Sequence, residues 1–416
     1  MARRRLLLDV SPLRASRDFR LLFAGQLISF MGSQLTVVAV AYQVYLLTRS
    51  SLQVGLVSMA QLGPLIAGSL VGGAIADSTD RRRLLLWMQV ALALTAVGLA
   101  VNASLAQPAV WPLYVLTALT AAFSGLDRPA RNAAIPNLVP RGSLPAAYAL
   151  MQVQMQVGLT AGPALAGILL GRAGLATVFW IDVATFVVAF AAVAGVRPLP
   201  PEGGGVRASA ASIVEGVRFI KGNRLLAGTF VIDLDAMVFG MPRALFPALG
   251  TGLYGGGAQT VGLLYAAPGA GALLGALLTG WVSNVRRQGL AVVVSVAVWG
   301  LAVAAFGLVS WLPLGLFLLA LAGAADMVSA VFRNTILQLS VPDSLRGRLS
   351  SAHIAVVTGG PRLGDAEAGA VAALAGPRVS AVSGGLACAV GVAVIARLFP
   401  ELVRYRSDDP ERAPVP

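Results

Sequence analysis

The segment Arg131-Asn-Ala-Ala-Ile-Pro-Asn-Leu-Val-Pro140 recurs later in the chain as Arg333-Asn-Thr-Ile-Leu-Gln-Leu-Ser-Val-Pro342. Arg-Asn opens both copies, Val-Pro closes both, and the copies are 202 positions apart in a chain of 416 residues. Another pair of segments also matches, since a proline and two glycines precede a polar loop in each: Pro64, Gly68 and Gly72 before Asp77, and Pro268, Gly271 and Gly275 before Asn284. Because internal repeats reflect repeated architecture, the sequence predicts two related halves.

The composition indicates a membrane protein. Hydrophobic residues make up 57% of the chain and charged residues 12%, against about a quarter charged in a soluble domain. The chain has one cysteine, Cys388, and one histidine, His353, which excludes a disulfide framework, a cysteine metal cluster and a multi-histidine metal or haem site. We therefore expect several membrane spans, no metal or other cofactor, no catalytic residues and no enzyme activity.

Twelve apolar runs are long enough to cross a bilayer. About 20 residues do so as a helix, because the backbone must satisfy its own hydrogen bonds in lipid. Spans one to six lie at 19–47, 54–76, 84–105, 110–126, 144–170 and 176–196, and spans seven to twelve at 225–249, 261–282, 290–309, 312–331, 351–374 and 379–399. The sequence thus predicts an all-α membrane protein with a six-helix N-terminal half (1–196), a cytoplasmic linker with an interfacial helix (197–223), and a six-helix C-terminal half with a tail (224–416).

The basic residues are concentrated on one side of these spans. The net charge is +13, and 26 of the 31 basic residues lie in the N-terminal segment, the even-numbered loops or the C-terminal tail, with Arg128, Arg131 and Arg333 counted as loop residues. Lys and Arg gather in cytoplasmic loops, so we expect a multi-pass protein of the plasma (cytoplasmic) membrane with both termini in the cytoplasm. Since topology explains the charge, we expect no nucleic-acid partner.

Ionisable residues inside predicted spans are the main indication of function, because they are costly there and usually face a cavity or a partner. Arg362 and Asp365 are three residues apart on one helix face and can neutralise each other, whereas Glu367 points elsewhere. A desolvated carboxylate can carry a proton near neutral pH. The candidates for the proton carrier are Asp365 or Glu367 first, then Asp233 or Asp235; a structural salt bridge between Arg362 and Asp365 is the alternative for that pair. For Asp182, after the interfacial Trp180, we expect a structural role.

Four motifs resemble those of the major facilitator superfamily, and within it the branch of efflux proteins that includes the enterobactin exporters. Gly73-Ala-Ile-Ala-Asp77-Ser-Thr-Asp80-Arg81-Arg82-Arg83 is similar to the superfamily signature between spans two and three. Gly158-Leu-Thr-Ala-Gly162-Pro163-Ala-Leu-Ala-Gly167 resembles the span-five motif of exporters and antiporters. Arg243-Ala-Leu-Phe-Pro247-Ala-Leu and Gly359-Gly-Pro361-Arg362-Leu-Gly364-Asp365 resemble the siderophore-exporter branch.

The resemblance implies two six-helix bundles that export an organic solute by proton-driven alternating access. It places a cavity between spans one, four, seven and ten, with the candidate lining residues Gln26, Gln34, Tyr42, Arg128, Asp233 and Asp326. It implies that Asp77 with Arg81 locks the halves on the cytoplasmic side. Gly158, Gly162, Pro163 and Gly167 would allow close helix packing, bending during rocking, or both. The basic residue that many drug antiporters carry in span four is not evident, so their coupling scheme does not transfer.

Two questions stay open from the sequence. The substrate is either a catecholate siderophore or a set of amphipathic drugs, and the several acids of the spans suit cationic or neutral drugs. The alternative function is a non-transporting accessory or regulatory membrane protein with the same fold, or an embedded transferase. The partners expected for the transporter are its small-molecule substrate, protons and the lipid bilayer, and we expect a monomer.

Overall fold

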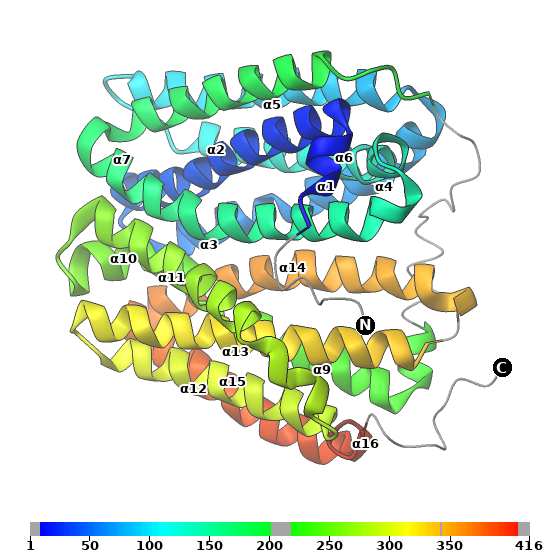
Figure 1. Ribbon diagram of the computed structural model, residues 1–416. Helices are drawn as coiled ribbons and strands as arrows, with labels where there is room; N and C mark the ends of the chain where they lie inside the picture. The colour runs from blue at the N-terminus through cyan, green and yellow to red at the C-terminus, as the bar shows by residue number, and fades with distance from the viewer. Residues whose placement is uncertain (1–8, 201–217, 342, 407–416) are drawn as a thin grey trace. The chain divides into compact units, whose positions relative to one another are not determined.

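A computed structural model describes residues 9–200, 218–341 and 343–406, without the side chains of residues 77, 279, 281, 283 and 343–355 (Figure 1). These ranges are almost entirely helical and contain no β-strand. The elements are α1 (Ser11–Ala15), α2 (Arg17–Thr48), α3 (Ser51–Ala60), α4 (Leu62–Ser78), α5 (Arg81–Ser104), α6 (Trp111–Leu138), η1 (Arg141–Ser143), α7 (Leu144–Ala194), α9 (Arg224–Phe239), η2 (Arg243–Leu245), α10 (Phe246–Ala248), η3 (Leu249–Leu253), α11 (Gly257–Leu277), η4 (Thr279–Asn284), α12 (Gln288–Leu308), α13 (Leu312–Leu339), α14 (Asp343–Ala375), α15 (Pro377–Leu398) and α16 (Pro400–Val403).

The chain packs into two compact units. Unit 1 comprises Met1–Val40 and Gly63–Arg207, and unit 2 comprises Ala41–Leu62 and Ala208–Pro416. Helix α2 therefore begins in unit 1 and ends in unit 2, and α3 belongs to unit 2 although it precedes α4 in the sequence. The division into halves and a linker at residues 196 and 223 stays a prediction.

The described residues hold the twelve predicted spans. Nine segments in this part of the chain are long and apolar enough to cross a membrane. One of them, Arg141–Ala194, contains spans five and six, because Gly174 interrupts α7 with a φ of 80°. Helices α6 and α14 contain charged residues and supply spans four and eleven. The fold class predicted from the sequence is confirmed.

Two helices continue past the ends of their predicted spans. The sequence places the end of span four at residue 126 and that of span ten at residue 331, whereas α6 continues to Leu138 and α13 to Leu339. Arg131 and Arg333 are therefore buried inside helices, with 6% and 4% of their surface exposed, and do not belong to cytoplasmic loops. Each helix can continue past its arginine because an acidic side chain neutralises the buried charge.

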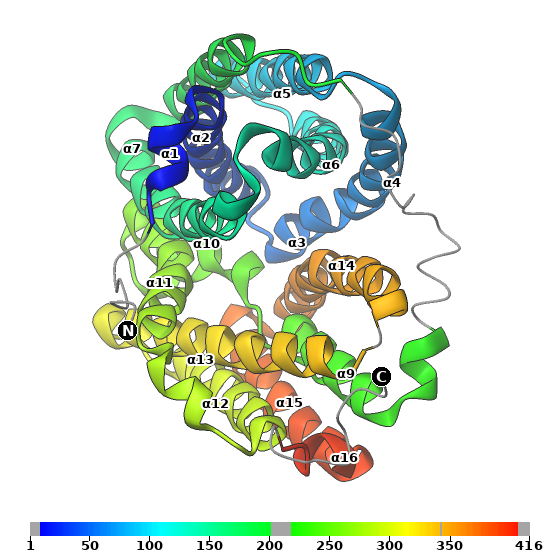
Figure 2. The same ribbon diagram turned by 45° about the vertical axis from the view of Figure 1, so that its right-hand side comes forward.

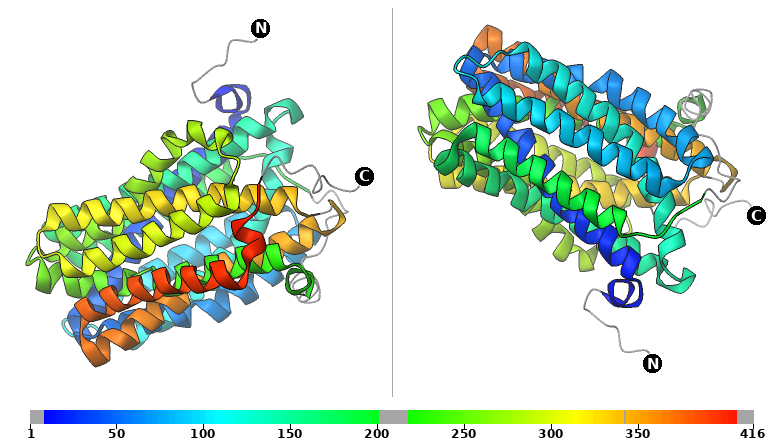
Figure 3. Two further views of the ribbon diagram at one scale, coloured as in Figure 1. Left: turned by 90° about the horizontal axis from the view of Figure 1, so that it is seen from below. Right: turned by 90° about the horizontal axis from the view of Figure 1, so that it is seen from above.

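In unit 1, α5 packs against both α6 and α7. Leu92 and Ala96 of α5 form a buried cluster with Phe186 of α7, and Phe123 of α6 packs against it. Figure 2 shows these helices nearly end-on as parts of one bundle. In unit 2, α12 packs against α13 and α15, and the three run alongside one another in yellow and red in the left view of Figure 3.

Close backbone approach recurs in equivalent places of the two units. In unit 1, a Cβ at Gly68 of α4 would overlap the Ala122 carbonyl of α6. In unit 2, a Cβ at Gly271 of α11 would overlap the Ala320 carbonyl of α13, and one at Gly323 would overlap the Pro268 carbonyl. Small residues let membrane helices approach in this way. The repeat predicted from the sequence therefore preserves the contact between the second and fourth helix of each half.

The start of α9 is tied to α16 at one end of unit 2. Arg224 donates from Nε to Oε1 of Glu401 at 2.7 Å. A backbone N–H of Glu401 itself and the neighbouring Arg224 hold the pKa of Glu401 below its usual range. At its other end α9 stops at Gly240, whose carbonyl accepts from Trp299 Nε1 at 2.8 Å. The chain then continues through the short turns η2, α10 and η3 before α11 begins.

Asp80 caps the N-terminus of α5. Its Oδ1 accepts from the backbone N–H groups of Arg82 at 2.8 Å and Arg83 at 3.2 Å. Replacing Asp80 by alanine is expected to lower the free energy of unfolding by about 1 kcal/mol, because two N–H groups of the first turn lose their acceptor. Thermal unfolding of the purified protein measures the loss. Asp80→Ser retains an acceptor. If Asp80→Ser lowered the free energy of unfolding as much as Asp80→Ala, the result would argue against the cap.

Candidate functional site

Helix α6 contains a buried ion pair. Asp127 and Arg131 are one helical turn apart on α6, and each has 6% of its surface exposed. Arg131 donates to Asp127 Oδ2 from Nε at 3.0 Å and also from Nη2. The pair is local, since both residues belong to the same helix, and it neutralises the arginine of the first repeat copy.

The arginine of the second repeat copy is neutralised across helices. Arg333 Nη1 of α13 lies 2.8 Å from Asp233 Oδ1 of α9, and Nη2 lies 3.7 Å from Asp326 Oδ1 of α13. The side chains of Arg333 and Asp233 are 4% and 2% exposed, whereas that of Asp326 is 34% exposed. Asp233 is thus held in the core of unit 2, and Asp326 forms the more accessible end of this charged triad.

Asp365 joins three elements of unit 2. Its Oδ1 accepts from the backbone N–H of Ala244 in η2 at 3.2 Å, and its Oδ2 lies 3.9 Å from Nη2 of Arg243. A Cβ at Gly55 of α3 would overlap the Asp365 carbonyl, so α3 and α14 are in direct backbone contact there. Arg362, the partner proposed from the sequence, donates from Nη1 to the Thr358 carbonyl at 2.6 Å.

The other two acids named as proton-carrier candidates are partly buried. In the ranges that the structure describes, Glu367 of α14 forms no ion pair. The carboxylate of Asp235 in α9 lies against Gly391 of α15, where a Cβ would overlap it, and its Oδ2 is buried. Cys388, which is fully buried in α15, lies beside Asp235. The assignment of the proton carrier stays a prediction.

The arginines of the signature loop tie α5 to its neighbours in unit 1. Arg81 Nη1 donates to the Ala133 carbonyl of α6 at 3.0 Å, and Arg82 Nη2 donates to the Ala194 carbonyl at the end of α7 at 2.6 Å. Cations near the C-terminal carbonyls of helices are favourable. The side chain of Asp77 lies outside the described set, and its gating role with Arg81 stays a prediction.

The span-five glycines contact α2. A Cβ at Gly158 would overlap the Phe30 ring, and one at Gly162 would lie 2.5 Å from the Gln34 Cβ. Pro163 and Gly167 are buried in the same segment of α7. Gln34, a candidate lining residue, therefore packs at this contact.

The remaining candidate lining residues differ in exposure. Gln26 is partly buried with its Oε1 enclosed, Tyr42 is partly buried, and Arg128 is exposed. Gln26, Gln34 and Arg128 belong to unit 1, and Tyr42, Asp233 and Asp326 belong to unit 2. Their assignment to one substrate cavity stays a prediction.

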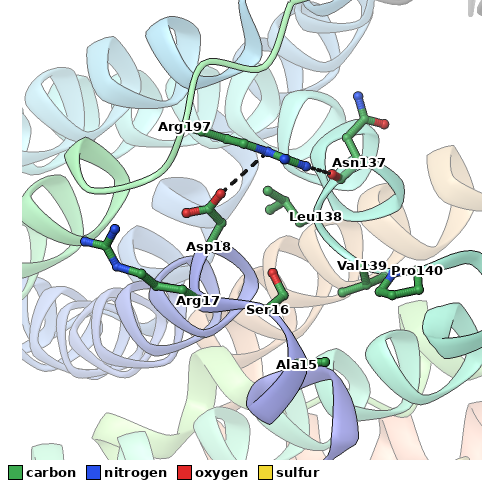
Figure 4. A pocket seen from close by; sticks show the side chains of 9 residues that line it. All are labelled: Ala15, Ser16, Arg17, Asp18, Asn137, Leu138, Val139, Pro140 and Arg197. Carbon is green, nitrogen blue, oxygen red and sulfur yellow. Dashed lines mark hydrogen bonds and ion pairs between the residues drawn. The ribbon is translucent and has the colours of Figure 1, made fainter.

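Unit 1 has a cavity of about 440 Å³ where α1 meets α2 and α6 ends (Figure 4). Arg197 crosses it, with Nε 3.5 Å from Asp18 Oδ2 and Nη2 donating to the Asn137 carbonyl at 2.6 Å. No candidate lining residue contributes to it, so this cavity is distinct from the predicted substrate site. The lining residues are Ala15, Ser16, Arg17, Asp18, Asn137, Leu138, Val139, Pro140 and Arg197.

Comparison with known proteins gives a match over nearly the whole chain. Residues 9–413 match the family described as transmembrane secretion effector. The chain belongs to this family of the major facilitator superfamily. The chain is 30% identical over 410 residues to the enterobactin exporter EntS of Citrobacter koseri, covering 99% of this chain and 98% of that one. It is also 30% identical over 405 residues to EntS of Escherichia coli O81, covering 97% of each chain.

Solved structures of several transporters have the same fold as this chain. The nucleoside transporter NupG has a TM-score of 0.74 at 13% identity, covering 93% of this chain and 99% of that one. A bacterial homologue of the human lysosomal transporter Spinster, in an inward-facing and unoccupied conformation, has a TM-score of 0.72 at 14% identity, covering 95% and 99%. The protein is thus a multi-pass membrane protein with a transporter fold.

Sequence reasoning missed three members of the buried ion pairs. Asp127 lies one residue past the predicted end of span four, and Arg131 and Arg333 are counted with the cytoplasmic arginines, because the charges end the apolar runs. The repeat itself was the available signal, since it puts Arg131 and Arg333 at equivalent positions. An arginine common to both copies needs a partner in both; the partner of Arg131 lies on its own helix, whereas Arg333 also pairs with Asp233 of another helix.

Proposed function

We propose that this protein exports a small organic molecule from the cytoplasm, driven by proton entry through alternating access. The observation that carries this proposal is the set of charged residues buried within its apolar helices, above all the triad of Asp233, Arg333 and Asp326. Intramembrane charges are costly and mark substrate or ion pathways.

Asp365 and Glu367 are the residues we propose for the proton step. Asp365 contacts Ala244 and Arg243 in the turn after α9, and its backbone touches α3. A change of charge on Asp365 alters the attraction to Arg243 and thus the packing of α3, η2 and α14. Glu367, two residues further along α14 and without an ion pair in the described ranges, is the second carrier; Asp233 and Asp235 are the alternative pair.

The proposed substrate is a catecholate siderophore, with amphipathic drugs as the rival. Full-length relatives that are 30% identical are named enterobactin exporters, which favours the siderophore. The partly exposed Asp326 instead favours cationic or neutral compounds. We propose that the substrate contacts the candidate lining residues Gln26, Gln34, Tyr42, Arg128 and Asp326, that the sixth candidate, the buried Asp233, acts on the substrate through Arg333, and that the protein works as a monomer with both termini in the cytoplasm.

Efflux from vesicles tests the proposal. A panel that contains a catecholate siderophore, cationic dyes and antibiotics is assayed in vesicles that contain the protein, with and without an imposed proton gradient. We expect gradient-dependent movement of one compound class, and protein-free vesicles are the control. If no compound moves, with or without the gradient, the accessory-protein alternative is the better account.

Neutral variants of the two α14 acids test the proton step. Glu367→Gln and Asp365→Asn retain shape and hydrogen-bonding capacity but cannot exchange a proton. We expect each to abolish the stimulation of efflux by the gradient, while efflux down a substrate gradient persists. Glu401→Gln, a partly exposed acid of the short helix α16 that the proposal does not involve, is the matched control and retains the stimulation. Unchanged stimulation in both α14 variants would assign the proton to another acid.

A further inference from the structure

A carboxyl group is buried between α2 and the second helical segment of α7. Asp182 has 2% of its surface exposed. It lies eight residues past the Gly174 turn, about 12 Å along the helix axis at 1.5 Å per residue. Asp182 belongs to the stretch Arg141–Ala194, which is long and apolar enough to cross a membrane. Neither the signature loop nor the proposed proton carriers on α14 involve this residue.

Hydroxyl groups from both helices surround the Asp182 carboxyl. Thr36 Oγ1 of α2 lies 2.5 Å from Asp182 Oδ2, and Thr185 Oγ1 lies 3.1 Å from Oδ1. Gly32, one turn before Thr36, makes the space, because a Cβ there would overlap both the Thr185 hydroxyl and the Asp182 carboxyl. Four residues at helical spacing on two helices thus form an enclosed polar site in unit 1.

No cation in the described part of the chain neutralises this carboxyl. Among the described residues, Asp182 takes part in no ion pair. The elements around it are α2, α5 through Leu92 and α6 through Phe123, in addition to α7 itself. The charged and titratable side chains of these elements are Asp18, Arg17, Arg20, Tyr42, Tyr45, Arg81, Arg82, Arg83, Tyr114, Asp127, Arg128, Arg131, Tyr148 and Arg172. None of these described side chains is hydrogen-bonded to Asp182, and Asp127 is already paired with Arg131.

A proton satisfies this site better than any other cation. Two neutral hydroxyls do not offset the cost of burying an ionised carboxylate in the hydrocarbon core. The neutral acid gains an O–H donor, and the Thr36 and Thr185 hydroxyls can each act as donor or acceptor toward it. The 2.5 Å between Thr36 Oγ1 and Asp182 Oδ2 is a hydrogen-bond distance that leaves no room for a metal ion between them.

We propose that Asp182 is a proton-binding site of unit 1 and that its proton sets how tightly α2 is held against the second segment of α7. The opposite contact of α2 is with Gly158 and Gly162 of the first segment, next to the candidate lining residue Gln34. Helix α2 therefore lies between the two segments of α7, and only the contact at Asp182 changes with a proton. The role in export rests on the proposed function; the proton site itself does not.

Infrared spectroscopy of the purified full-length protein tests the site without any substrate. A neutral carboxylic acid has a carbonyl stretching band that an ionised carboxylate lacks. Every protonated carboxyl contributes to this band, so we expect Asp182→Asn to remove one component of it, whereas Asp18→Asn, at the surface of the same unit, leaves the band unchanged. An identical band in the wild type and in Asp182→Asn, or no such band in the wild type at neutral pH, would overturn the proposal.

A second variant tests the proposal even if Asp182→Asn does not fold. Thr36→Val retains the acid and nearly the same volume but removes one hydrogen-bond partner, so we expect the band to shift to higher frequency while persisting. An unshifted band in Thr36→Val would show that the neutral acid lies elsewhere.

The coupling of this site to transport is tested by the pH profile of gradient-driven efflux. We expect Asp182→Asn to flatten the profile, whereas a purely structural residue would lower efflux by the same factor at every pH. A profile of unchanged shape in a folded Asp182→Asn protein would contradict the proposed control of α2. The infrared band is measured without substrate. A band that Asp182→Asn does not change would therefore refute the proton site, whereas absence of efflux would refute only the proposed export function.

Discussion

Replacing Arg333 by leucine is expected to lower the free energy of unfolding by about 3–5 kcal/mol, the cost of leaving one member of a buried ion pair without its partner. The variant leaves Asp233, which is 1% exposed, without the guanidinium 2.8 Å away. Asp326 also loses its cation. We expect little folded protein, which thermal unfolding of the purified protein and its yield from membranes would measure.

Two controls separate this effect from the loss of any arginine. Arg397→Leu, at an exposed position in the last turn of α15, is expected to cost less than about 1 kcal/mol, because only a favourable helix-end charge is lost. The double variant Arg333→Leu/Asp233→Leu removes both buried charges and should recover much of the stability, since apolar residues can replace a buried pair. Transport is not expected to return. A single Arg333→Leu variant as stable as the wild type would contradict the ion pair.

Replacing Gly323 by valine is expected to have the second largest effect on folding. A Cβ at this position would overlap the Pro268 carbonyl of α11, and a backbone carbonyl cannot move aside as a flexible side chain can. Overpacking costs about 1–3 kcal/mol, and backbone overlap belongs at the top of that range. We expect a marked loss of folded protein, measured as the shift of the thermal unfolding midpoint.

Gly63 of α4 is the matched control for this substitution. No atom lies within 4 Å of a Cβ built there, so Gly63→Val should have a small effect, and valine is slightly the better helix former. Gly275→Ala is an intermediate case, because its nearest neighbour is the Ala324 Cα at 3.2 Å. Equal stability of the Gly323 and Gly63 variants would mean that α11 and α13 are not as close as described.

The sequence alone was sufficient to predict the twelve spans and the two related halves. Apolar runs and a repeat displaced by 202 residues carry that information directly. The ends of α6 and α13 were missed, because a charge that ends an apolar run has the same appearance in sequence whether it lies in a loop or is neutralised inside a helix. Arg131 and Arg333 are of the second kind.

The partners of buried charges could be predicted only where they are local. Asp127 and Arg131 are four residues apart on one helix, a spacing that sequence reasoning can use. Thr36 and Asp182 are separated by 146 residues, and Ala244 and Asp365 by 121. Such contacts depend on how the helices pack, and a single amino-acid sequence does not indicate them.

Unit 2 consists of two separate stretches of the chain, which limits where the chain can be cut into fragments that fold. Its residues 41–62 precede most of unit 1 in the sequence, and α3 packs on α14, where Gly55 meets the Asp365 carbonyl and Gly369 meets that of Ser51. A C-terminal fragment made alone would lack α3 and leave this small-residue surface of α14 exposed to lipid. The final packing of α14 therefore requires a segment that precedes nearly all of unit 1 in the chain, so a C-terminal fragment is not an autonomous folding module.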